Sequence, residues 1–323
     1  MKKIVLMDPY LLKFTQPMVD WWEKCGYEVK VSRYYDPSLV RWADIVYFFT
    51  ADNNLRSATN PPIDPDFDGY DIHQMDLTGK KVIVQPIDIE CWEGHHQASK
   101  WGLVDHVIFI ADHIRELCPP DSLPELTAKT QFHTIPFSID IDKWTFKERE
   151  PGFDIAVVSE RWVSKGTDLI LQIALKLKQI DERYKIHWLG QLSPHWPWEH
   201  AYMNDFIERH KLNIEITNIL NDGRTVDEFL EDKNYLLHAS KKEGFSAATA
   251  EAAAKGLKPI IHSFYGYEPL WGDSGWVWDS IDQAVEMITS SEYDSLAYKD
   301  YLIKKGYNTD VMMNRIMSAI GEK

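Results

Sequence analysis

Short apolar runs separated by polar, loop or helical stretches recur along the whole chain. In the first part, such runs predict buried strands at 3–7, 27–31, 45–49, 81–85, 105–110 and 133–136. Residues 18–25, closed by Gly26, have a helical pattern. A further helix is predicted to begin at Asp112, and Asp112 itself could either cap that helix or belong to a ligand crevice. Residues 51–71, rich in Pro, Gly, Asp and Asn, predict a long surface loop. Strands that alternate with crossovers favour a parallel, doubly wound sheet.

The same pattern restarts after a charged linker at 147–152, which ends in a Pro-Gly turn. Further strands are predicted at 153–158, 185–189, 213–217, 234–240 and 259–262, and the segment Gly-Trp-Val-Trp follows at 275–278. Helices are expected at 167–177, 226–230 and 280–288, where apolar positions recur at helical spacing. We therefore expect an α/β chain with a first Rossmann-like domain over 1–146, a second over 147–292, and a helical segment over 293–323.

Residues 241–256 contain the most informative stretch, Lys-Lys-Glu-Gly-Phe-Ser-Ala-Ala-Thr-Ala-Glu-Ala-Ala-Ala-Lys-Gly. It predicts a turn after a strand, then an Ala-rich helix closed by Gly256, and then another strand. A turn of this kind points backbone N–H groups and the positive end of the helix dipole at a ligand, which suits a diphosphate. Glu243 is expected in the turn and Glu251 about two turns into the helix. Both carboxylates could accept hydrogen bonds from sugar or ribose hydroxyls.

This stretch resembles the E-x7-E signature of retaining GT-B glycosyltransferases of the GT4 type. The resemblance implies two Rossmann-like domains facing a central cleft, with the segment over 293–323 crossing back to the first domain. It implies a nucleotide-diphosphate sugar as donor, expected to be UDP-linked, and transfer with retention at the anomeric carbon. It also implies that no metal or other cofactor is needed. In that family the first Glu, here Glu243, contacts the donor sugar as a catalytic residue, and the second, here Glu251, binds the ribose. Gly244, Phe245 and Ser246 continue the motif and are expected on the donor side.

Further donor contacts are expected where other strands of the second half end. Arg161 and Lys165, followed by Gly166, resemble the Gly-Arg-x4-Lys-Gly segment whose two cations hold the donor phosphates in the same family. A guanidinium binds phosphate oxygens in pairs and an ammonium acts as a point charge, so both could offset charge on a departing diphosphate. Gly190 stands where relatives have a turn near the nucleotide base, although a plain turn glycine explains it equally well.

The acceptor side is expected in the segment that follows the strand at 81–85. Asp88, a candidate catalytic residue, and Glu90 could orient an acceptor hydroxyl or take its proton, and His95 and His96 could do the same. For each of the four, a structural role in the loop is favoured over a role in the site. Two adjacent histidines point apart on a regular element, so a shared metal is not expected.

The composition of the chain limits which classes of binding partner are expected. The net charge of −15 is divided as −8 over 1–145 and −7 over 146–323, so neither half has the basic footprint of a nucleic-acid binder. A DNA acceptor, such as hydroxymethylated phage-type DNA, stays possible through a local groove but is not favoured. No apolar run approaches the roughly 20 residues that span a bilayer, so no integral membrane contact is expected. Three widely spaced cysteines form no disulfide framework, which favours the cytoplasm.

Two other functions stay open from the sequence alone. A sugar-nucleotide epimerase on the same scaffold would use the carboxylates and histidines of 88–96 as acids and bases. A non-catalytic nucleotide-sugar binding module would keep the fold without the reaction. The acceptor could be a glycan, a metabolite or a modified base, and the chain could be a monomer or a homodimer.

Overall fold

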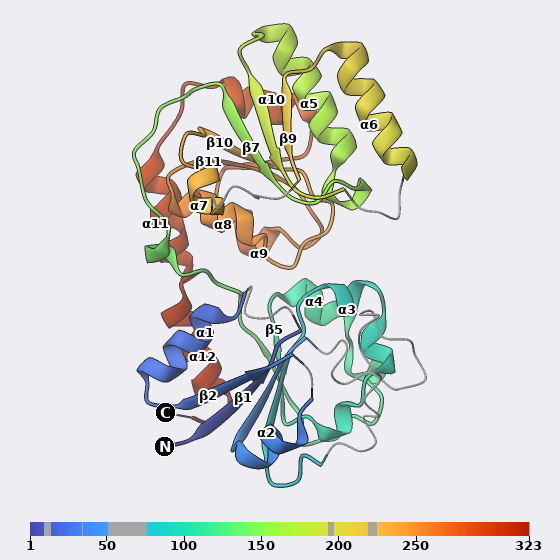
Figure 1. The fold of residues 1–323 in the computed structure, drawn as a ribbon, viewed down its shortest axis with the longest axis vertical. Helices are drawn as coiled ribbons and strands as arrows, with labels where there is room; N and C mark the ends of the chain where they lie inside the picture. Colours follow the sequence, from blue (N-terminus) through green and yellow to red (C-terminus); the bar gives the residue numbers. More distant parts are fainter. Residues whose placement is uncertain (10–13, 34, 51–75, 193–196, 219–224, 323) are drawn as a thin grey trace. The chain divides into compact units, whose positions relative to one another are not determined.

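The computed structural model of the protein describes residues 1–9, 14–33, 35–50, 76–192, 197–218 and 225–322. It forms two compact units, one made of Met1–Phe137 with Thr309–Lys323 and the other of Ser138–Asn308. Each unit is built on a six-stranded, all-parallel sheet with helices on its faces (Figure 1). The predicted loop at 51–71 lies outside the described residues.

The first unit has the sheet order β2-β1-β3-β4-β5-β6. Its strands are β1 (Lys3–Met7), β2 (Glu28–Ser32), β3 (Ile45–Phe49), β4 (Lys81–Gln85), β5 (His106–Phe109) and β6 (Gln131–Thr134). Its helices are α1 (Gln16–Lys24), α2 (Pro37–Trp42), α3 (Ile89–Trp92), α4 (Asp112–Leu117) and α12 (Thr309–Ala319). All five residues of β3 are buried, as expected of a strand covered on both faces.

Helix α12 completes the first unit by packing beside α1 (Figure 1). The buried Trp22 ring of α1 lies edge-on to Tyr47 of β3 at 5.4 Å, and its indole N–H donates to the Met317 sulfur at 3.4 Å. Close to the chain ends, the Lys2 ammonium donates to the Glu322 carboxylate at 2.5 Å. The last residues of the chain are therefore part of the same unit as the first.

The second unit has the sheet order β12-β11-β10-β7-β8-β9. Its strands are β7 (Asp154–Val158), β8 (Lys185–Leu189), β9 (Ile214–Thr217), β10 (Tyr235–His238), β11 (Lys258–His262) and β12 (Val277–Trp278). Its helices are α5 (Thr167–Ile180), α6 (Pro197–His210), α7 (Val226–Phe229), α8 (Ala247–Ala254), α9 (Glu268–Trp271), α10 (Ile281–Thr289) and α11 (Ser295–Lys305).

Two helical layers cover the second sheet. Helices α5, α6 and α10 lie on one face, where Ile170 of α5 and Ala284 of α10 pack in one core with Trp188 of β8. On the other face, a smaller core contains Ala252 of α8 with Ala156 of β7, and α11 packs against α8 (Figure 1). Successive residues of a strand point to opposite faces, so one strand contributes to both cores.

The order of the strands indicates where a ligand could bind in the second unit. From β7 the chain runs to β8 and β9 on one side, and it returns to place β10 and β11 on the other. The strand order thus reverses between β7 and β10. In open parallel sheets, ligands bind outside the carboxyl ends of the strands at such a switch point.

The structure corrects three local predictions. Helix α6 and the short helices α2 and α3 were not expected from the sequence. Asp112 is the first residue of α4, and the cap position belongs to Ala111, so Asp112 does not cap the helix. Helix α8 begins at Ala247, which places Glu251 about one turn into the helix instead of two.

None of the helices within the described ranges is both long and apolar enough to cross a membrane.

Candidate active site

Two turns lie side by side at the switch point of the second unit: the one between β7 and α5, and the one between β10 and α8. The Lys241 backbone N–H donates to the Ser164 carbonyl at 2.8 Å, which joins them. Gly166 has φ of 73°, and a Cβ there would lie 2.1 Å from the Ala239 carbonyl oxygen. Only glycine fits this position, because any side chain would push the two turns apart.

Gly190, at the end of β8, has a similar steric role. A Cβ at this position would lie 1.8 Å from the Ser159 carbonyl oxygen, where the ends of β7 and β8 meet. The Ser159 N–H donates to the Leu189 carbonyl at 3.0 Å and continues the pairing of the two strands. Close backbone packing therefore explains this glycine, and contact with a nucleotide base stays a prediction.

Arg161 is a buried cation at the switch point. Only 3% of the residue is exposed, and its backbone N–H donates to the Gln191 carbonyl at 2.9 Å. The guanidinium donates to the side-chain oxygen of Asn218, directly after β9, while its Nε–H has no hydrogen-bond partner among the described residues. No carboxylate of the described residues lies within ion-pair distance of it. Burial lowers the pKa of Arg161 from its ordinary 12.5, but a guanidinium stays protonated in proteins.

Lys165 and Glu243 form an ion pair across the two turns. The Lys165 ammonium lies 2.6 Å from Glu243 Oε1, and their side chains are 23% and 15% exposed. His238, the last residue of β10, has its Nε2 3.6 Å from the same carboxylate oxygen. The structure thus brings together a cation and a carboxylate that lie 78 positions apart in the sequence.

These neighbours determine the charge of Glu243. Burial by itself would raise the pKa of this carboxyl, but the Lys165 ammonium and then His238 outweigh burial and hold its pKa well below the ordinary 4.5. Glu243 is therefore ionised at neutral pH. An ionised carboxylate accepts hydrogen bonds and stabilises nearby positive charge, but it has no proton to give.

The start of α8 completes the site. Ser246 stands at the cap position with φ of 67°, a left-handed conformation that is uncommon for a residue with a side chain. Its hydroxyl lies 2.7 Å from that of Thr249. Phe245 is buried, with its ring edge-on to Tyr307 at 5.0 Å, and Gly244 before it is also buried. Glu251 is half-buried in α8.

The four acceptor-side candidates lie in the first unit, after β4. Glu90 is fully buried and accepts from the Thr50 hydroxyl at 2.6 Å. His96 is buried too, with its Nδ1 3.1 Å from the Glu90 carbonyl oxygen. Asp88 is half-buried and directly precedes α3, where its carbonyl accepts the Trp92 N–H, and His95 is half-buried. These contacts order the segment, and a role toward an acceptor stays a prediction for each residue.

His238 and Asn218 belong to the candidate site but were not selected from the sequence. Each lies at the carboxyl end of a strand, or one residue beyond it, in the sheet that holds Arg161 and Glu243. Inspection of every strand end of the second half would have found both. Within the described ranges, no group of three or more His, Cys, Asp or Glu side chains is arranged to hold a metal ion.

Comparison with known proteins identifies the fold. No protein-family model matches the chain, and no curated protein sequence matches it. Among solved structures, a UDP-forming α,α-trehalose-phosphate synthase from Burkholderia xenovorans is 11% identical with a TM-score of 0.70, and 99% of each chain is covered. HepE from Anabaena, solved with UDP-glucose, is 13% identical with a TM-score of 0.69, over 99% of this chain and 100% of HepE.

The chain has the GT-B fold. A further structure, S. aureus TarM solved with UDP, is 14% identical with a TM-score of 0.61 over 86% of this chain. The chain spans 55% of the length of that TarM chain. At such low identities the likeness shows the fold alone. The GT-B fold is the one expected from the sequence.

Proposed function

We propose that the protein is a retaining glycosyltransferase of the GT4 type that transfers a sugar from a nucleotide-diphosphate donor, UDP-linked, to a hydroxyl acceptor. The single observation that carries this proposal is the buried guanidinium of Arg161. Taking a cation out of water without a counter-charge is costly. A diphosphate bound at the switch point would supply the missing negative charge.

The proposed roles follow from the charges in the site. Arg161 holds the diphosphate and, together with Lys165 and the N-terminus of α8, offsets the charge that develops when the nucleotide leaves. The ionised carboxylate of Glu243 accepts from the donor sugar and faces the positive charge of an oxocarbenium-like transition state. Glu251 accepts from the ribose hydroxyls. A front-face transfer that retains configuration needs neither a protein nucleophile nor a metal.

Three of the solved structures support the choice of donor, because TarM, pneumococcal GtfA and HepE were each solved with UDP or UDP-glucose. For the acceptor we propose a neutral hydroxyl compound or glycan, since the acidic chain disfavours anionic partners. The three cysteines are free thiols, and we place the protein in the cytoplasm on that ground.

Incubation with UDP-sugars and a panel of neutral acceptors tests the proposal. We expect UDP release that depends on the acceptor, and a product whose anomeric configuration, measured by NMR, equals that of the donor. Glu243→Gln removes the charge with little change in shape and should abolish transfer while UDP still binds. An inverted product, or full activity of Glu243→Gln, would contradict the proposed mechanism.

A further inference from the structure

A cavity of about 910 Å³ lies within the second unit, away from the candidate active site. It is lined by Lys258, the first residue of β11, and by Trp276, just before β12. Both residues lie at the amino edge of the sheet, whereas Arg161 and Glu243 lie at the carboxyl edge. A five-residue strand separates the two edges by roughly 13 Å. A donor bound at the switch point would leave this cavity open.

Aromatic rings held in place form part of the wall. The Trp276 ring lies edge-on to Tyr298 at 5.2 Å and to Tyr301 at 5.0 Å. The hydroxyl of Tyr298 accepts from the Asp294 N–H at 2.9 Å, and that of Tyr293 donates to the Gly256 carbonyl at 3.2 Å. The tyrosine hydroxyls are thus used to fix the rings, so the wall is rigid before any ligand arrives.

The charges of the cavity argue against an anionic ligand. Its lysine, Lys258, is buried, and its ammonium donates to the carbonyls of Met287 at 2.8 Å and Glu292 at 2.7 Å. The side chains of Glu286 and Glu292 are exposed, and neither has an ion-pair partner in the part of the chain that the structure describes. The carboxylates of Glu286, Glu292 and Asp294 would repel phosphate or another acid, and the one lysine is already engaged.

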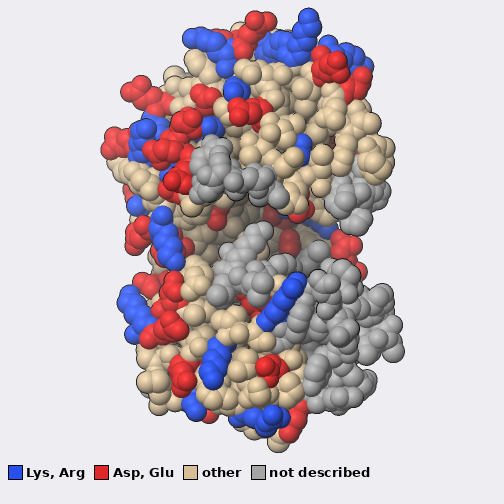
Figure 2. Space-filling model, viewed as in Figure 1, with Lys and Arg blue, Asp and Glu red and all other residues tan. Residues whose placement is uncertain are grey.

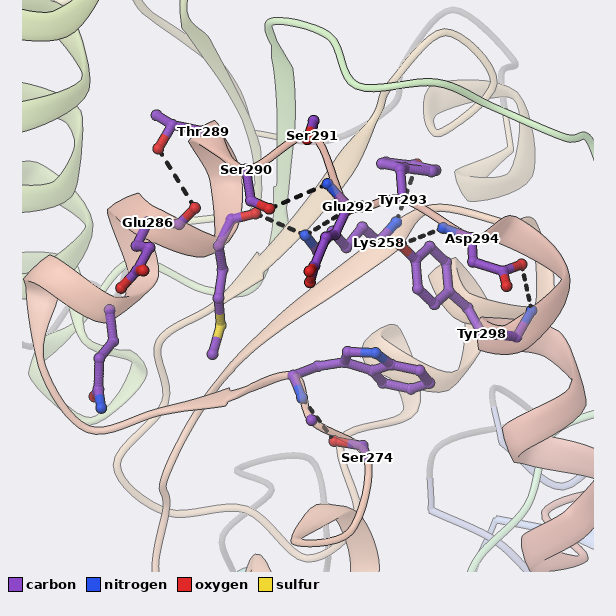
Figure 3. A pocket seen from close by; sticks show the side chains of 15 residues that line it. Lys258, Ser274, Glu286, Thr289, Ser290, Ser291, Glu292, Tyr293, Asp294 and Tyr298 are labelled. Atoms are coloured by element: carbon purple, nitrogen blue, oxygen red, sulfur yellow. Dashed lines mark hydrogen bonds between the residues drawn. The ribbon is translucent and has the colours of Figure 1, made fainter.

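The acceptor groups are spread along the cavity. Figure 3 shows Glu286, Glu292 and Asp294 well apart from one another, with Ser290 and Ser291 between Glu286 and Asp294. A ligand with a single cationic centre would need carboxylates that converge on one point, and these do not. Separate acceptors beside an aromatic wall suit a ligand that carries many hydroxyls along its length and has apolar C–H faces between them.

We propose that this cavity binds a neutral oligosaccharide segment, apart from the donor site. The choice of a saccharide among polyhydroxylated ligands rests on the proposed glycosyltransferase function. Trp276 stacks on the apolar face of a sugar ring, and the Glu286 and Glu292 carboxylates accept from its hydroxyls. Such a site raises the local concentration of a glycan acceptor around the candidate active site.

Saturation-transfer NMR with maltotetraose, cellotetraose and chitotetraose tests this proposal. We expect at least one tetrasaccharide to bind the wild-type protein, with or without UDP present. The double variant Glu286→Gln/Glu292→Gln should weaken that binding by about tenfold or more, and Trp276→Ala should abolish it. Glu182→Gln, another exposed glutamate of the same unit, is the matched control and should bind as the wild type does.

The outcomes separate this site from the proposed function. Wild-type transfer activity without binding of any tetrasaccharide, or unchanged binding by the double variant, overturns the saccharide site alone. If the wild type binds a tetrasaccharide and the double variant binds it more weakly, but the protein transfers no sugar, the saccharide site is supported and only the proposed function is contradicted. The carboxylates could also attract a polyamine. If spermidine binds at this cavity and none of the saccharides does, the proposal is overturned.

Discussion

Arg161 carries a charge that the fold removes from water and that no described carboxylate neutralises. The hydrogen bond from the guanidinium to Asn218 satisfies part of the group, yet the charge itself stays uncompensated. Such a residue costs stability in the free protein and favours the bound state of an anion. Binding residues of this kind are a common source of the trade-off between stability and activity.

Arg161→Met is the variant that tests this interpretation. It keeps most of the side-chain length and removes the charge, so we expect the ligand-free protein to gain about 1 kcal/mol in free energy of unfolding. Urea unfolding measures this gain. Arg183→Met, at an exposed ion pair with Asp181, is the control and should change stability by less than about 1 kcal/mol. A clear loss of stability in Arg161→Met would show that the guanidinium is a structural group.

The depressed pKa of Glu243 predicts a pH dependence. Because the folded pKa lies below the ordinary 4.5, the ionised carboxylate contributes stability above that pH. The contribution is lost progressively as the pH falls below about 4.5, toward the folded pKa. We therefore expect the stability difference between wild type and Glu243→Gln to be largest at pH 7 and to shrink between pH 4.5 and 3. Paired urea titrations at each pH measure it; a difference that does not change with pH would contradict the assigned pKa.

At the scale of elements, Lys255 ties the end of α8 to its surroundings. Its fully buried ammonium donates to Asp227 at 2.6 Å, to Glu231 at 3.1 Å and to the Thr145 carbonyl at 3.2 Å. Two segments, one at Thr145 and one over 227–231, are therefore tied to the end of α8 by one cation. This arrangement fixes the end of the helix whose other end opens the candidate site.

Lys255→Met should accordingly destabilise the protein by about 3 kcal/mol, because it leaves a carboxylate pair without its buried partner. Lys176→Met removes a lysine that pairs with Asp282 on the surface and should cost less than about 1 kcal/mol. Thermal and urea unfolding of the two variants provide the comparison. Equal effects of both substitutions would mean that burial of Lys255 contributes nothing specific.

The elements also show what the sequence could and could not predict. Helix α8 was evident because an alanine run ends at Gly256, which has the left-handed φ of 85° that a helix end favours. Helix α6 was not predicted, because of its fourteen residues only Glu199, Met203 and Phe206 are buried, too few to give a clear apolar stripe. Helix α3, with four residues, is too short for periodicity to reveal.

In the candidate site, local motifs predicted the residues but not their partners. The pairing of Lys165 with Glu243 depends on two turns that only the folded sheet brings together. The contribution of His238 arises in the same way, from the end of a neighbouring strand. Asn218 beside Arg161 had no motif around it, and only the position of β9 next to β8 explains its contact.

At the scale of the whole molecule, charge bears on the class of acceptor. Lys and Arg are interspersed with Asp and Glu over the described residues that Figure 2 presents, and the net charge is −15. Binding to nucleic acid depends on cations that release counterions from the phosphates. The distribution therefore favours a neutral acceptor.

We expect duplex DNA, with or without hydroxymethylated bases, to show no mobility shift with this protein at physiological salt. A shift that weakens steeply with added salt would contradict this expectation and would restore DNA as an acceptor. The nucleotide site should bind UDP in the same buffer, which controls for a properly folded sample.

The most direct test of the central claim is thermal unfolding of the wild type and of Arg161→Met with UDP, GDP, ADP and CMP. A ligand that binds only the folded state, at a hundredfold excess over its dissociation constant, stabilises by about 2.7 kcal/mol. We predict that UDP raises the wild-type Tm most and that Arg161→Met loses this shift. No response to any of the nucleotides, or an equal UDP response in both proteins, would contradict a diphosphate site at Arg161.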